Sequence, residues 1–145
     1  MKRLRCRGVA AIEAALVMAA LAPLLVLLLN TGRLAINGAA VDRAASNAAR
    51  LLSTVPLEIL RDGSRRGAAL DSARYLIDET LAAAGVDVQT LHVEYMCDPG
   101  HCDELQATST PSRIGVLVVV DNQPVVDFGA APVTLSAYAE VGRGD

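Results

Sequence analysis

The longest apolar stretch of the chain runs from residue 9 to residue 29, VAAIEAALVMAALAPLLVLLL, and contains one charged residue, Glu13. With a rise of about 1.5 Å per residue, a helix of this length would measure about 31 Å. That is close to the ~30 Å thickness of the hydrocarbon layer of a bilayer. Pro23 lies inside the run, where a membrane helix tolerates proline and where we expect it to bend the axis. The pattern predicts one transmembrane helix.

The helical pattern continues beyond this run in an Ala-rich segment. Apolar residues recur there at spacings of three, four and seven, which places them on one helical face: Leu34, Val41, Ala45, Ala48 and Leu52. We therefore predict one long helix, transmembrane over 9–29 and amphipathic over its extension, 30–54. Small residues let helices approach closely, and the candidate helix-packing positions are Gly32, Ala40, Ala44 and Ala48.

A break and a second helix are predicted next. Pro56 and the polar stretch RDGSRRG interrupt the pattern, so residues 55–67 are expected to form a linker. A second helix is predicted from Ala68 to Ala84, with Gly85 as its C-terminal cap. Its apolar stripe consists of Leu70, Ala73, Leu76, Ile77 and Leu81.

Beyond Gly85 the period of the apolar positions changes to that of strands. Strands are predicted at 86–96, 114–120 and 133–141, with a polar, turn-rich segment at 97–112 and a turn at 122–124. Two helices followed by a small antiparallel sheet of about three strands give an α+β fold. Residues 68–145 are expected to form one α+β domain.

The charge distribution is organised around the apolar run. The first eight residues, MKRLRCRG, carry four positive charges and no negative ones, although the whole chain has a net charge of −3. Basic residues flank membrane helices on the cytoplasmic side, so the N-terminus is predicted to be cytoplasmic and the domain extracytoplasmic. The acidic balance and the absence of tryptophan argue against a nucleic-acid partner.

The start of the apolar run has the most informative order of residues. Arg7-Gly8 is followed by Val9-Ala10-Ala11-Ile12 and then by Glu13. Placing a carboxylate in hydrocarbon costs about 2.5 kcal/mol or more. Glu13 is therefore expected either to have a partner and a function within the membrane, or to lie near the surface and reach the headgroups.

This segment resembles the processing site of type IV pilin-like proteins, and more closely the TadE-like minor pilins or pseudopilins of the Tad (Flp) pilus. The matching features are Arg7-Gly8, the following residues up to Glu13, the apolar run, Gly32-Arg33 and the Ala-rich helix through Arg50. They cover about the first third of the chain. Pro23 departs from a plain pilin stem, and no role can be derived for Cys6 in the leader.

The resemblance implies a processing step and a role in assembly. A membrane prepilin peptidase would cut between Gly8 and Val9 and remove residues 1–8 as a leader. The Glu13 carboxylate would then pair with the new N-terminal amine of a subunit in the assembly. The implied protein is a single-pass component of the cytoplasmic (inner) membrane, whose partners are the peptidase and other pilin or pseudopilin subunits, and which can be incorporated into a surface pilus for adhesion.

Two other classes of function remain open. The first is a membrane-anchored or secreted binding module with an ordinary or uncleaved signal, although the apolar core of a signal is usually only about 7–15 residues long. The second is a membrane-tethered enzyme, but the sequence has no nucleophile elbow, catalytic triad or phosphate-binding loop. We therefore expect no catalytic residue, no cofactor and no small-molecule substrate.

Two cysteines of the predicted domain flank the sequence DPGH. Cys97 and Cys102 would lie in an oxidising compartment, and a Pro-Gly turn between them can bring them together, so a disulfide is predicted. The alternatives are free thiols or a metal site formed by Cys97, His101 and Cys102 with His92 as a fourth ligand. That spacing is not a standard zinc pattern. The basic cluster of Arg61, Arg65 and Arg66 is expected to be a solvated loop, with lipid headgroups as an alternative contact.

Overall fold

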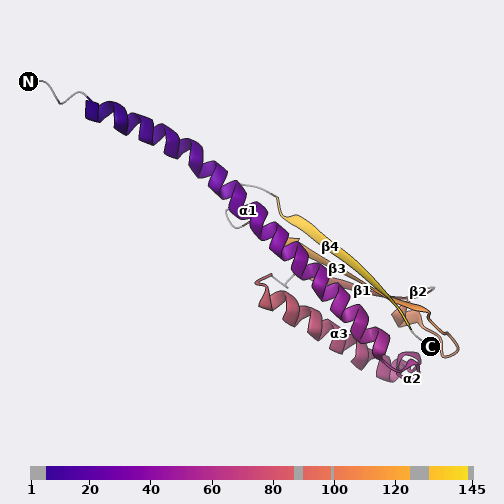
Figure 1. The fold of residues 1–145 in the computed structure, drawn as a ribbon. Coiled ribbons are helices and arrows are strands. Elements are labelled where there is room, and N and C mark those ends of the chain that lie inside the picture. Colours follow the sequence, from indigo (N-terminus) through magenta and orange to yellow (C-terminus); the bar gives the residue numbers. More distant parts are fainter. Residues whose placement is uncertain (1–5, 87–89, 99, 125–130, 144–145) are drawn as a thin grey trace, which may run out of the picture.

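The fold is given by a computed structural model, which describes residues 6–86, 90–98, 100–124 and 131–143. Its dominant element is α1, Cys6–Thr54, a single helix that continues through Pro23. Figure 1 shows that the first half of α1 projects away from the rest of the molecule and that the second half lies within it. The predicted long N-terminal helix is confirmed. Residues 1–5 of the expected leader lie outside the described residues.

Two further helices follow α1, and they begin earlier than the sequence predicted. The short helix α2, Leu57–Arg61, and the first turn of α3, Gly63–Ala83, occupy the segment expected to be a linker. The helix α3 starts at Gly63 because the Asp62 carboxylate accepts the backbone N–H of Ser64 at 2.9 Å, which is an N-cap contact. At the other end, Gly85 adopts the left-handed conformation, with φ +72°, that suits a C-terminal cap.

The remaining elements form an antiparallel sheet with the order β2-β1-β3-β4. The three predicted strands correspond to β1, His92–Cys97, β3, Arg113–Asn122, and β4, Val133–Gly142. The fourth strand, β2, is the two-residue segment Gly100–His101, which pairs with the end of β1 and is followed by a 3₁₀ turn, Cys102–Glu104. Residues 87–89 of the predicted first strand, and Pro99 of the predicted Pro-Gly turn, lie outside the described residues.

The core forms where α1 and α3 pack beside each other on one face of this sheet (Figure 1). Alternate residues of β3 point into it and are fully buried: Ile114, Val116, Val118 and Val120. The amphipathic face of α1 and the predicted stripe of α3 meet them, apart from Leu34 and Leu76, which are only partly buried. Alanine dominates the face of α1, so its backbone can lie close to the sheet and to α3.

Polar contacts fix both ends of the packed half of α1. Near the projecting half, the Arg33 guanidinium donates to the carbonyl of Gly85 at 3.2 Å, and the Asn37 amide donates to the Asn122 side-chain oxygen. At the far end, the Arg143 guanidinium donates to the carbonyl of Val55, just past the last turn of α1. A cation at this end also complements the helix dipole. These contacts hold the packed half of α1 to the domain at both ends. The projecting half continues from it as the same helix.

Candidate functional site

The projecting half of α1 exposes an apolar surface that has no partner within the chain. The most apolar window of the helix is 0% buried, and the helix is long and apolar enough to cross a membrane. Most of its large side chains are more than half exposed, among them Leu16, Met18, Leu24, Leu27 and Leu28. A core helix of a soluble protein would bury this surface. The geometry instead fits a single-pass membrane anchor.

Glu13 lies within this exposed apolar surface. It is the charged residue of the run, and its side chain is not covered by any other part of the described chain. It follows Val9 by four residues on a continuous helix, so the two positions lie on one helical face, about 6 Å apart along the axis. A carboxylate in this position needs a cationic partner from outside the described chain, or contact with headgroups.

The structure divides the predicted helix-packing positions into two groups. Ala40, Ala44 and Ala48 are almost completely buried, because α1 packs through them against α3 and the sheet of the same chain. Gly32, by contrast, is exposed, and a Cβ added to it would meet nothing within 4 Å. The close approach that the small residues allow is therefore used inside the molecule at the three alanines, whereas Gly32 lies on an open surface.

The cysteines of the domain form the predicted disulfide. The Cys97 and Cys102 sulfurs are 2.11 Å apart, both residues are buried, and the bond joins the end of β1 to the 3₁₀ turn that follows β2. Because both sulfurs are bonded to each other, they are not available as thiolate ligands, and the alternative metal site is wrong. His92 is exposed and lies 3.1 Å from a carboxylate oxygen of Glu94. Within the described ranges, no group of three or more metal-ligating side chains comes together.

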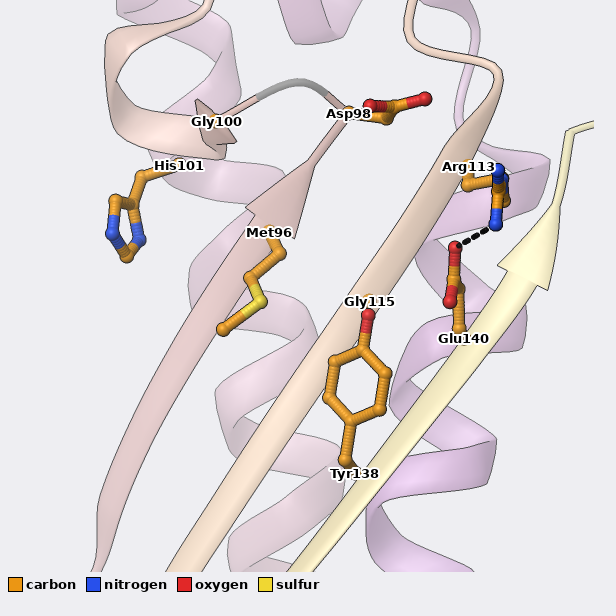
Figure 2. A pocket seen from close by; sticks show the side chains of 8 residues that line it. All are labelled: Met96, Asp98, Gly100, His101, Arg113, Gly115, Tyr138 and Glu140. Atoms are coloured by element: carbon orange, nitrogen blue, oxygen red, sulfur yellow. Dashed lines mark ion pairs between the residues drawn. The ribbon is translucent and has the colours of Figure 1, made fainter.

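The face of the sheet opposite the helices carries a shallow concavity of about 390 Å³ (Figure 2). It is lined by side chains from β1, β3 and β4, including Met96, Arg113 and Tyr138. The Tyr138 ring lies across Gly115, where a Cβ would come within 2.5 Å of the phenol oxygen. Arg113 pairs with Glu140 at 3.2 Å, and partial burial together with Glu140 raises the pKa of the Tyr138 phenol. These contacts order the sheet surface around an exposed aromatic side chain.

Two members of the basic cluster after α1 bind backbone carbonyls, whereas Arg65 is exposed and lies 3.5 Å from the Asp62 carboxylate. Arg66 donates to the carbonyls of Leu105 and Asp103 at 2.9 and 2.8 Å, and Arg61 donates to the carbonyl of Ser109 at 2.7 Å. These bonds hold the loop after the disulfide against α2 and α3. Figure 1 shows α2 at the end of the domain farthest from the projecting half of α1. The cluster is thus remote from the membrane segment, which argues against the alternative of a headgroup contact. The expected solvated loop is wrong as well, because these residues belong to the helices α2 and α3.

One residue of the structural framework was missed in the sequence. Asn37 is only 3% exposed and joins α1 to the end of β3 through Asn122. The sequence signal that could have revealed Asn37 was its position on the helix. It lies three residues after Leu34 and four before Val41, so it occupies the apolar face of the helix. A polar residue at such a position is expected to have a hydrogen-bond partner.

Comparison with known proteins finds a family resemblance in the N-terminal third of the chain. The family model of TadE-like protein matches residues 8–50. The matched segment begins at Gly8, includes Glu13 and the apolar run, and ends within the buried part of α1. This is the family that the sequence motif predicted. No curated protein and no solved structure matches the chain.

Proposed function

We propose that this chain, TadE-like over residues 8–50, is a minor pilin or pseudopilin that takes part in assembling a Tad (Flp) pilus for adhesion or surface attachment. A prepilin peptidase removes residues 1–8, and the mature chain begins at Val9. The protein acts as a structural subunit and not as an enzyme. The observation that carries the proposal is Glu13, a carboxylate in an exposed apolar helix, five residues after Gly8 and inside the family-matched segment.

The chemistry of Glu13 supports a role in subunit packing. Cleavage after Gly8 creates an ammonium group on Val9, at the boundary of the apolar helix. An unpaired carboxylate in hydrocarbon is costly, and an adjacent ammonium of a neighbouring subunit offsets most of that cost. The pair therefore favours one axial register between adjacent helices, because a shift of either helix separates the two charges.

The continuity of α1 extends this register to the whole subunit. The same helix contains Glu13 and the buried alanines of the domain core, without a break between them. A register set at Glu13 therefore also sets the height of the domain relative to its neighbours. The partners are other pilin or pseudopilin subunits. Before incorporation, the protein resides in the inner membrane with a cytoplasmic N-terminus and an extracytoplasmic domain.

Replacement of the carboxylate tests this role. We expect Glu13→Ala to be cleaved by the peptidase nearly as well as the parent chain, while the amount of assembled pilus falls severalfold. Leu16→Ala is the matched control, since it shortens an exposed side chain of the same helix without removing a charge. Pili should be counted by electron microscopy and cleavage followed by mass. Normal assembly of the Glu13→Ala variant would refute charge pairing.

A second candidate function is an anchored extracytoplasmic binding module with an uncleaved first segment. The observation that favours it is the concavity around Tyr138 and Met96 on the open sheet face (Figure 2). Such a module would need the anchor only to hold the domain outside the membrane. Glu13→Ala would then leave its function unchanged, and the chain would retain Met1.

A further inference from the structure

The domain begins with almost no spacer after the apolar run. That run ends at Leu29, and Thr31 and Leu34 already line a groove together with the end of the sheet. Arg33 is bonded to the end of α3, and Asn37 to the end of β3. The ends of α3 and β3 therefore lie beside the segment of α1 that leaves the hydrocarbon.

The depth of this segment follows from helix geometry. Along a helix axis, Arg33 lies about 6 Å and Ile36 about 10 Å beyond Leu29. The headgroup layer on each side of a bilayer is about 5–7 Å thick. If residues 9–29 fill the hydrocarbon layer, Arg33 lies among the headgroups and Ile36 lies about 3–5 Å beyond their outer limit. The groove-lining residues from Leu28 to Arg33 therefore span the headgroup layer, and the Gly85 carbonyl bonded to Arg33 lies at this depth.

Two grooves flank α1 at this level. The first, of about 590 Å³, lies toward α3 and is lined by Leu28, Leu29, Gly32, Arg33, Ile36, Asn37 and Ala84. The second, of about 180 Å³, lies toward the sheet and is lined by Asn30, Thr31, Leu34, Asn122, Pro124, Ala131 and Val133. We call the two sets of lining residues together the base of the domain.

The chemistry of the base suits lipid. Ile36 is 64% exposed and Val133 is 48% exposed, although both belong to the part of the chain beyond the apolar run. Arg33 is the charged residue among those that line the two grooves, and no carboxylate stands among these described residues. Its aliphatic stem can lie along apolar surface while its guanidinium meets lipid phosphates. Apolar grooves beside one cation match the boundary between acyl chains and headgroups.

We propose that the base is a lipid-docking surface, seated in the headgroup region of the leaflet on the domain side. Acyl chains and headgroups fill the two grooves, because the base continues the apolar surface of the membrane helix without a gap. Docking at two places on opposite sides of α1 fixes the tilt of the domain relative to the bilayer. The proposal rests on single-pass anchoring, and it requires neither cleavage after Gly8 nor assembly into a pilus.

Lipid-attached quenchers test the docking in the full-length chain. The chain, with Cys6→Ser, is reconstituted at a low protein-to-lipid ratio into vesicles of phosphatidylcholine and phosphatidylglycerol. Single labelling sites are introduced by Ile36→Cys and Val133→Cys, while the Cys97–Cys102 disulfide stays oxidised and unlabelled. Thr108→Cys is the matched control, since it is exposed in the loop held against the far end of the domain.

The expected result is that lipids spin-labelled near the headgroup quench the fluorophores at residues 36 and 133 severalfold more than the fluorophore at residue 108. Equal quenching at all three sites would overturn the proposal. The proposal would also be overturned if the fluorophores at residues 36 and 133 became protected only at a high protein-to-lipid ratio. A second copy of the chain, and not lipid, would then cover the base. Glu13→Ala should leave the quenching unchanged, so failure of lipid docking and failure of the proposed assembly function can be distinguished.

Discussion

At the scale of single residues, the alanines of α1 determine how closely the helix can approach the sheet. Ala44, Ala45, Ala48 and Ala49 have no exposed surface, and all four belong to the core that α1 forms with α3 and the sheet. A core at this density has no room for larger side chains. The small size that marked this face as a helix-packing surface is therefore required within the chain itself.

Enlarging one of these alanines should destabilise the domain. We expect Ala44→Leu to lower the free energy of unfolding by about 1–3 kcal/mol, because the added carbons would have to displace the strands or α3. Ala39→Leu is the matched control, since Ala39 lies on the exposed side of the same helix and should change stability little. Urea unfolding of both variants in detergent micelles measures the difference. Equal effects at the two positions would contradict the packing described.

Tyr95 offers a test through its hydroxyl group. Burial raises the pKa of this phenol to about 12, and the neutral hydroxyl donates to the carbonyl of Leu70 at 3.3 Å. A raised pKa in the folded state stabilises the fold fully below the unfolded value of about 10, and the contribution is lost as the pH rises from about 10 to 12. Tyr95→Phe should cost about 1 kcal/mol at neutral pH.

The pH dependence separates this effect from a packing defect. Unfolding of Tyr95→Phe and of the parent chain should be compared at pH 8 and pH 11. The parent should lose more stability than the variant between these values, because only the parent carries the titrating group at this position. A parallel decline of the two proteins would show that Tyr95 does not titrate as described.

At the scale of elements, a partly buried pair of amides, Asn37 and Asn122, joins α1 to the sheet. Removing Asn37 leaves the Asn122 side chain without its partner, which should cost about 1–3 kcal/mol for Asn37→Ala. Asn47→Ala, on the exposed side of α1, is the control. The double variant Asn37→Ala, Asn122→Ala should be less destabilised than the sum of the two single variants. Simple additivity would indicate that the two side chains do not interact.

The elements with a strong apolar period were predicted from the sequence, whereas those defined by polar contacts were not. The faces of α1 and α3 and the strands β3 and β4 follow from their spacing of apolar residues. The helix α2 and the early start of α3 were missed because RDGSRRG has the composition of a loop, although Asp62 caps the helix. The strand β2 is only two residues long, and no pattern can reveal it.

The candidate site, too, could be predicted from the sequence only in part. The motif from Gly8 to Glu13 and the apolar run were found from the order and type of residues. Spacing alone could not show that Ala40, Ala44 and Ala48 pack within the chain, because a face of small residues fits an internal or an external partner equally well. The roles of Arg61 and Arg66 depend on carbonyl groups of a distant loop, which local sequence does not reveal.

At the scale of the whole molecule, α1 links the membrane segment to the domain. Its first half presents Glu13 and an uncovered apolar surface, and its second half lies in the core. A chain built in this way transmits the position of its apolar helix to its domain. In the function proposed above, cleavage after Gly8 is the step that turns this chain into a subunit competent for assembly.

N-terminal sequencing of the mature protein, isolated from cells with and without prepilin peptidase, tests this account most directly. The account predicts a chain that begins at Val9 in the presence of the peptidase and at Met1 in its absence. A chain that retains Met1 in cells with active peptidase, or that begins near residues 30–40, would contradict it.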